Sequence, residues 1–173
     1  MTLVPGDPAS LSACARTVAE VAGRLRTEAG GLEHATTALG EGWTGRTSAT
    51  TRRSAAELAG ATASLADELE GVARALQDQA TDLADLVARE RGVRERATVA
   101  GLEVRDGRVE LAWGVSGTAD AGRRDEQEAA RAALQSDLDL VAAQHARRRD
   151  FVLGLLRASS ATLAEVSHAL RLG

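Results

Sequence analysis

The residues in this chain with the greatest potential for chemistry are three histidines and one cysteine. His34, His145 and His168 lie far apart, and none has the His-Glu-x-x-His or cysteine-containing spacing of a zinc site. Cys14 falls on an apolar helical pattern, so we expect a buried, inert thiol and no nucleophile. His145 also falls on such a pattern, where we expect a hydrogen-bonded core residue. From the positions of these four residues we expect no metal site.

The common catalytic and nucleotide-binding motifs do not occur in the sequence. There is no Gly-x-Ser-x-Gly elbow and no Gly-x-Gly-x-x-Gly after a strand. The chain has no lysine, so it also lacks the Gly-x-x-x-x-Gly-Lys phosphate loop. We therefore expect no enzymatic activity and no cofactor.

Charge and hydropathy bear on the class of partner. The 25 acidic and 21 basic residues are interspersed and give a net charge of −4, which argues against nucleic-acid binding. The run Arg147-Arg148-Arg149 next to Asp150 is interpreted as a solvated helix face. No run reaches the ~18 apolar residues of a membrane span, and the first residues lack the pattern of a Sec signal peptide.

The first helix and the turn after it are marked by punctuation residues. Asp7 before Pro8 is typical of a helix start, because the carboxylate caps free N–H groups and proline at the first position loses no hydrogen bond. The spacing predicts a helix over 8–40 and a glycine-framed elbow over 41–46 that contains Trp43 and Gly45. The apolar seam of this helix is expected at Leu11, Cys14, Val18, Val21, Leu25, Leu32, Ala35 and Leu39.

Two further helical stretches follow the elbow. The second is predicted over 47–98, and the third over 122–171, with four helices as the alternative if the third breaks near 147–160. Gln79 is a polar exception on the seam of the second helix. The apolar members of that seam are Leu58, Leu65, Leu69, Val72, Leu76, Leu83 and Leu86.

Between these helices the apolar period changes from helical to two. Asp106-Gly107 is a strong signal for a type I′ turn, because both positions need a positive φ. The sequence predicts a β-hairpin over 102–115 that pairs Val104 with Val109 and Leu102 with Leu111. Two strands alone are marginal in water, so the hairpin is expected to rest on the helix ends.

Together these patterns predict a mainly all-α protein. Aromatic residues make up 2% of the chain, and much of the apolar content is alanine, the strongest helix former. We expect one elongated domain over 1–173, a long antiparallel bundle of three helices with the small β-hairpin between the second and the third.

The helical hairpin with Trp43-Thr44-Gly45 at its elbow resembles the WXG family of type VII (ESX) secretion proteins. Members are antiparallel helical hairpins that commonly dimerise, and larger actinobacterial substrates carry a related N-terminal domain. The resemblance covers about residues 6–95. It implies a secretion and turn motif at Trp43 and Gly45.

The chain departs from the family at the export motif, Tyr-x-x-x-Asp/Glu, because it contains no tyrosine. Leu86-Val-Ala-Arg-Glu90 has the i, i+4 spacing with leucine at the tyrosine position, so Leu86 and Glu90 form a degenerate export motif. In the family one partner can carry the signal for both, which makes this chain a candidate for a carried partner.

Two functional readings follow. The resemblance implies a protein of the cytoplasm that is then secreted or held at the cell surface, as a substrate or as the escort of a toxin-like substrate. Its partner would be a second copy, another WXG-like or toxin-type protein, or the secretion ATPase. The alternative is a cytosolic coiled-coil adaptor or chaperone-like protein that is not secreted.

Overall fold

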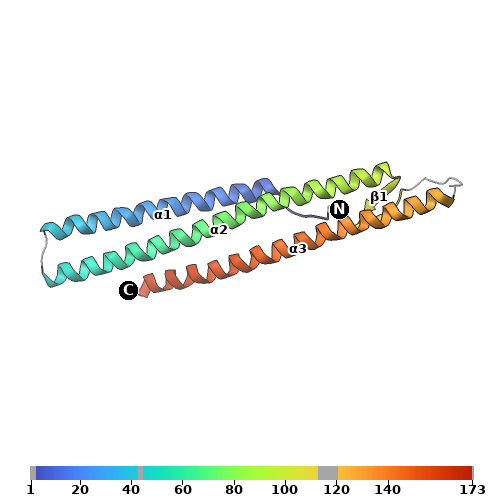
Figure 1. Ribbon diagram of the computed structural model, residues 1–173. Coiled ribbons are helices and arrows are strands. Elements are labelled where there is room, and N and C mark those ends of the chain that lie inside the picture. The colour runs from blue at the N-terminus through green and yellow to red at the C-terminus, as the bar shows by residue number, and fades with distance from the viewer. Residues whose placement is uncertain (1–2, 43–44, 113–120, 173) are drawn as a thin grey trace. The chain divides into compact units, whose positions relative to one another are not determined.

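The fold is mainly helical, as predicted. The computed structural model describes residues 3–42, 45–112 and 121–172 and contains three long helices and one antiparallel β-hairpin. Figure 1 shows the elements in chain order. They are α1 (Pro8–Gly42), α2 (Arg46–Val99), β1 (Leu102–Arg105), β2 (Arg108–Leu111) and α3 (Ala121–Leu172).

The contacts of the chain divide it into two compact units. The first unit comprises Met1–Pro8 and Gln79–Phe151, and the second comprises Ala9–Asp78 and Val152–Gly173. The helices α2 and α3 contribute to both units. Because α3 is one continuous helix through 147–160, the alternative with a break and four helices is wrong.

The second unit is a three-helix assembly in which α1 and α2 run antiparallel. Ser12 near the start of α1 donates a hydrogen bond of 2.9 Å to Gln77, whereas Arg26, two heptads later, forms ion pairs with Asp67 and Glu70. A buried cluster joins all three helices. Its buried members are Ala15 of α1, Val72 and Leu76 of α2, and Val152 of α3.

Buried alanines recur at heptad spacing on both α1 and α2 in the second unit. Ala15, Ala22 and Ala29 on α1 are 3%, 0% and 4% exposed, and Ala59 and Ala66 on α2 are both 0% exposed. A methyl side chain lets two helices approach to the near end of the ~8–10 Å range of interaxial distances. The buried alanines therefore allow the helices of this unit to pack closely.

This arrangement corrects the predicted seam of the first helix. Cys14 is exposed, because the inward position is taken by its neighbour Ala15. Leu39 is likewise 55% exposed, and Leu58 of α2 is 43% exposed. The prediction that these three residues are buried was wrong, since it followed the larger apolar side chains instead of the alanines.

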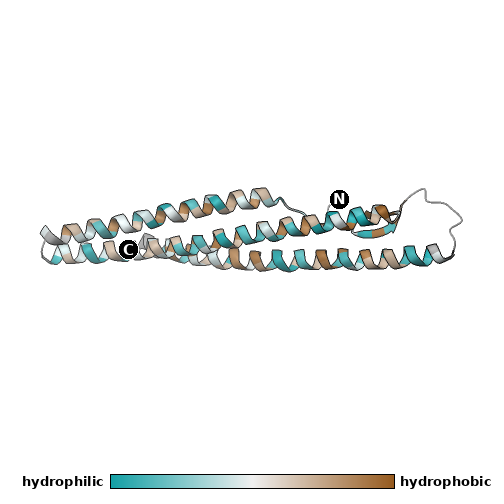
Figure 2. Cartoon of the chain, turned by 45° about the horizontal axis from the view of Figure 1, so that its top comes forward, coloured by the Kyte–Doolittle hydropathy of each residue, from teal (hydrophilic) through white to brown (hydrophobic). Residues whose placement is uncertain are grey.

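On α2 the predicted seam is confirmed from Val72 onward. Leu76, Leu83 and Leu86 are buried, and the polar exception Gln79 is buried with them at 7% exposure. Within the described chain, its Oε1 atom has no hydrogen-bond partner. His145 of α3 is buried, as expected. Figure 2 shows hydrophobic residues recurring between hydrophilic ones along the helices.

In the first unit, the β-hairpin packs on the end of α2 and the start of α3, as the sequence predicts. The register pairs Leu102 with Leu111 and Val104 with Val109, and Asp106 and Gly107 have φ values of 49° and 80°. Leu111 is nevertheless 60% exposed. The buried members of the core here are Val93, Ala97, Leu102, Val109, Leu134 and Leu138.

Gln135 of α3 fixes the hairpin through both ends of its side-chain amide. Its Oε1 accepts a hydrogen bond of 2.8 Å from the N–H of Val109, and its Nε2 donates one of 3.2 Å to the carbonyl of Gly107. The hairpin lies over 102–111 in the described residues, whereas Trp113 and Val115 of the predicted hairpin lie outside them.

The alanine packing makes a testable prediction. Replacing Ala66 by leucine forces three extra carbons into a fully buried site, so we expect a loss of about 1–3 kcal/mol in the free energy of unfolding. Urea denaturation followed by circular dichroism measures it. The matched control is Ala56→Leu at an exposed position of the same helix, which should change stability little. Equal effects of the two substitutions would contradict the close packing.

Candidate functional site

The elbow between α1 and α2 is described only in part. Trp43 and Thr44 lie outside the described residues. Gly45, directly before the start of α2, has a φ of 121°, and an added Cβ would meet nothing within 4 Å. The backbone conformation at position 45 therefore explains why this residue is glycine, whereas crowding does not. The role of Trp43-Thr44-Gly45 as a secretion motif stays a prediction.

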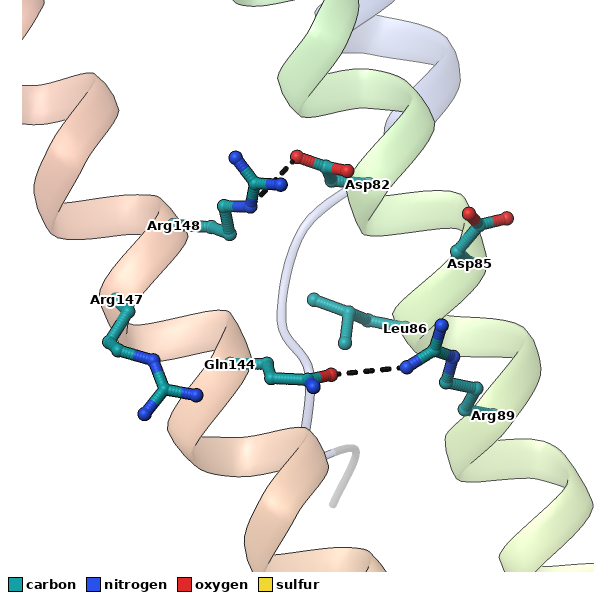
Figure 3. A pocket seen from close by; sticks show the side chains of 7 residues that line it. All are labelled: Asp82, Asp85, Leu86, Arg89, Gln144, Arg147 and Arg148. Atoms are coloured by element: carbon teal, nitrogen blue, oxygen red, sulfur yellow. Dashed lines mark hydrogen bonds and ion pairs between the residues drawn. The ribbon is translucent and has the colours of Figure 1, made fainter.

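Leu86 and Glu90, the degenerate export motif, lie one turn apart on α2. Both side chains are buried, with exposed fractions of 5% and 3%. Leu86 lies between α2 and α3 in Figure 3. A motif that is read by another protein needs an accessible surface, so in this conformation the two side chains are covered. Their role in export stays a prediction.

Glu90 binds the segment that precedes α1. Its Oε1 accepts a hydrogen bond of 3.0 Å from the N–H of Leu3, and its Oε2 accepts one of 3.0 Å from the N–H of Val4. Val4 is itself buried, at 3% exposure. One carboxylate thus satisfies two consecutive backbone donors of a segment that belongs to no helix or strand.

Arg94 completes this arrangement from the next turn of α2. Its Nη2 and Nε donate to Oε1 of Glu90 at 2.8 and 3.1 Å, and its Nη1 donates to the carbonyl of Val104 on β1 at 3.1 Å. The pair therefore joins three parts of the first unit: the N-terminal segment, α2 and the β-hairpin. We call Glu90 and Arg94 the carboxylate clamp.

The clamp keeps Glu90 charged. Burial of the carboxylate raises the pKa of Glu90, but the hydrogen bonds from Leu3, Arg94 and Val4 and the positive charge of Arg94 lower it by more. The net result is a pKa below the ordinary value of 4.5. A buried carboxylate held charged by two backbone donors and a guanidinium is a structural device, because no face of it is open to a substrate.

Sequence reasoning missed the clamp, although a signal for it was present. Glu90 continues the apolar series of α2 from Leu86 to Val93, so a charged residue stands at a buried seam position. Arg94 follows at i+4, which is the spacing of an ion pair on one helix. A carboxylate on an apolar seam with arginine one turn later indicates a buried pair.

The described residues contain neither a group of metal ligands nor a membrane-spanning helix. Across 3–42, 45–112 and 121–172, no three His, Cys, Asp or Glu side chains lie close enough together to hold a metal ion. His34 and His168 are exposed. None of the helices, within the residues described, is long and apolar enough to cross a membrane.

Comparison with known proteins gives one match. Residues 6–88 match the model of the family WXG100, described as proteins of 100 residues with WXG. The matched segment runs from just before α1 into the second half of α2, so it includes α1, the elbow and most of α2. The match indicates a helical protein related to type VII secretion. No curated protein and no solved structure matches the chain.

The clamp makes a prediction about stability. Glu90→Gln keeps the size of the side chain but removes its charge and places an amide donor opposite one of the three donor groups. We expect the free energy of unfolding to fall by about 1–3 kcal/mol, the usual cost of leaving a buried hydrogen-bonding group without its partner. Urea denaturation at pH 7 measures it. Glu95→Gln, at an exposed position of the same helix, should leave stability nearly unchanged, and an equal loss would contradict the clamp.

The lowered pKa of Glu90 makes a prediction about pH. Folding favours the charged form, so the stability that Glu90 contributes is complete above its ordinary pKa of 4.5 and is lost as the pH falls through its lower folded value. The difference in unfolding free energy between the wild type and Glu90→Gln should therefore shrink when urea titrations are repeated from pH 7 to pH 3. A difference that stays constant over this range would show that the charge of Glu90 is not responsible.

Proposed function

We propose that the chain, whose residues 6–88 match the WXG100 family, is a non-enzymatic component of a type VII secretion system. In this proposal it is exported as a substrate or leaves the cell as the partner of a toxin-like substrate. The observation that carries the proposal is the match over α1, the elbow and most of α2, together with the glycine of positive φ at the elbow.

The role of carried partner is favoured over independent export. The chain has no tyrosine, so the motif position is Leu86, and both Leu86 and Glu90 are buried. A partner that presents an accessible motif of its own would supply the signal for the pair. The same burial favours the second candidate function, a cytosolic adaptor that binds its partner and stays in the cell.

Export is tested in the source bacterium with its type VII ATPase intact or deleted. We expect the protein in the culture filtrate only when the ATPase is present, with a cytosolic marker confined to the pellet in both strains. Immunoblots of the two fractions measure this. Protein confined to the pellet in both strains would overturn the secretion proposal and favour the adaptor.

Glu90→Asp separates the export motif from the clamp. The family motif accepts Asp or Glu, whereas the clamp needs the length of the glutamate side chain to reach the N–H groups of Leu3 and Val4. If export depends on the motif, Glu90→Asp should be exported and Glu90→Gln should not, although both are less stable than the wild type. If both variants are exported, the signal comes from the partner, and if neither is, the clamp itself is needed.

A further inference from the structure

The segment that precedes α1 belongs to the first unit without being continuous with the rest of that unit in the chain. It comprises residues 3–7, and Figure 1 shows it as a coil beside the second half of α2. The rest of the first unit begins only at Gln79, because the intervening residues Ala9–Asp78 belong to the second unit. The segment is therefore held by non-covalent contacts, as a peptide is held by the protein that binds it.

The site recognises the backbone of the segment at two neighbouring positions. The N–H groups of Leu3 and Val4 both donate to the carboxylate of Glu90, each at 3.0 Å. Successive N–H groups of a regular strand point to opposite sides, whereas a bent backbone can turn two of them toward one anion. The chain bends at both residues. Glu90 thus selects a bent backbone that offers two consecutive amide donors.

The side chains of the segment are recognised as well. Val4 is 3% exposed, and Leu3 packs against the hydrophobic core of the β-hairpin. Its Cδ1 atom lies 3.2 Å from where a Cβ at Gly107 would stand. Gly6 has a φ of 126°, and a Cβ there would lie 3.0 Å from Cδ2 of Leu83, so this position favours glycine twice over. We call the residues that make these contacts the segment-binding site: Leu83, Glu90 and Gly107.

The first unit has a hydrophobic core of its own apart from the segment. The buried members of that core all come from α2, the β-hairpin and α3, and Leu3 is a partly buried neighbour of them. Glu90 also accepts hydrogen bonds of 2.8 and 3.1 Å from Arg94. When the segment leaves, the carboxylate therefore keeps its guanidinium partner and avoids the large cost of a buried charge without one. These contacts allow the segment to leave while the site stays formed.

We propose that the segment-binding site is a peptide-binding site, which residues 3–7 fill within the chain and which takes a segment of another protein when they leave. Its ligand has two consecutive amide donors on an apolar pair such as Leu-Val, followed by proline and glycine. The inference does not depend on the role in secretion. Glu90 and Gly107 lie beyond the residues that match the WXG family, and no export step enters the argument.

The tethered segment competes with any ligand in solution. The chain holds residues 3–7 near the site at a high effective concentration, and a free peptide binds only the molecules in which they have left. The wild type should therefore bind such a peptide weakly. Val4→Asp should release the segment, because it places a second carboxylate at a buried position beside Glu90. The emptied site is then open to the peptide.

A peptide titration of the full chain tests the proposal. The probe is a synthetic peptide of residues 3–7, acetylated so that its first N–H is an amide, and the amide NMR signals of Glu90 and Gly107 report binding. We expect Val4→Asp to bind it about tenfold or more tightly than the wild type, since most wild-type sites are already filled. Adding Glu90→Gln should weaken this binding about tenfold, the effect of losing one hydrogen bond to a charged group.

Two controls accompany the titration. Ala13→Asp adds the same charge at an exposed position of α1 and should bind the peptide as weakly as the wild type. A peptide with aspartate in place of its valine should not bind the Val4→Asp protein. Circular dichroism melts check that each variant is folded.

Hydrogen exchange on the wild type tests the release of the segment without a substitution. The amide of Val4 should exchange faster than that of Val93 in the core, and excess peptide should speed it further. Exchange of Val4 only as fast as Val93 would overturn the proposal. So would a folded Val4→Asp variant that binds no peptide, binding that Glu90→Gln leaves unchanged, or a Val4→Asp variant that does not fold, because the segment would then be an integral part of the unit.

Discussion

The first unit depends on the hydrogen bonds of one buried carboxylate, that of Glu90. Taking a charge out of water is costly, and it is tolerated here because two backbone N–H groups and one guanidinium surround it. These three donors come from two parts of the chain, the N-terminal segment and α2. Leu3 and Val4 precede the first helix, and Arg94 reaches the carbonyl of Val104 on the hairpin. A single charge on α2 therefore organises the elements that cover this end of the helix.

The two units cover the apolar surface of their helices with different elements. A pair of amphipathic helices leaves an apolar surface that a third layer must cover. In the second unit this layer is α1, and its buried alanines allow close contact between helices. In the first unit the layer consists of a short β-hairpin and the N-terminal segment, which are held by polar groups such as Gln135 and Glu90. Helix-on-helix packing needs only matched small side chains, whereas irregular segments need individual hydrogen bonds for their backbone groups.

Local signals in the sequence were enough to predict the helices and the β-hairpin, but not which side chains are buried between them. Asp7-Pro8 and Asp106-Gly107 predicted the start of α1 and the hairpin with its register, because each depends on the backbone preferences of neighbouring residues. The seam of α1 was misplaced, since Leu39 and Cys14 are more hydrophobic than the alanines that are in fact buried. Burial is decided by the partner helix, which no local pattern contains. The same holds for Glu90, whose spacing with Leu86 was noticed for its likeness to a family motif, while its bonds to Leu3 and Val4 depend on a contact across more than eighty residues.

The buried alanines at heptad spacing also affect the thermodynamics of the helical hairpin formed by α1 and α2. An alanine loses no side-chain rotamer freedom when it is buried, so α1 and α2 come together at a low entropic cost per residue. Each methyl group also removes little apolar surface from water. The increase in heat capacity on unfolding should consequently be small for a chain of this length, since that quantity grows with the apolar area exposed. The free energy of unfolding of such a helical hairpin changes only gradually with temperature, so its stability curve has a broad maximum.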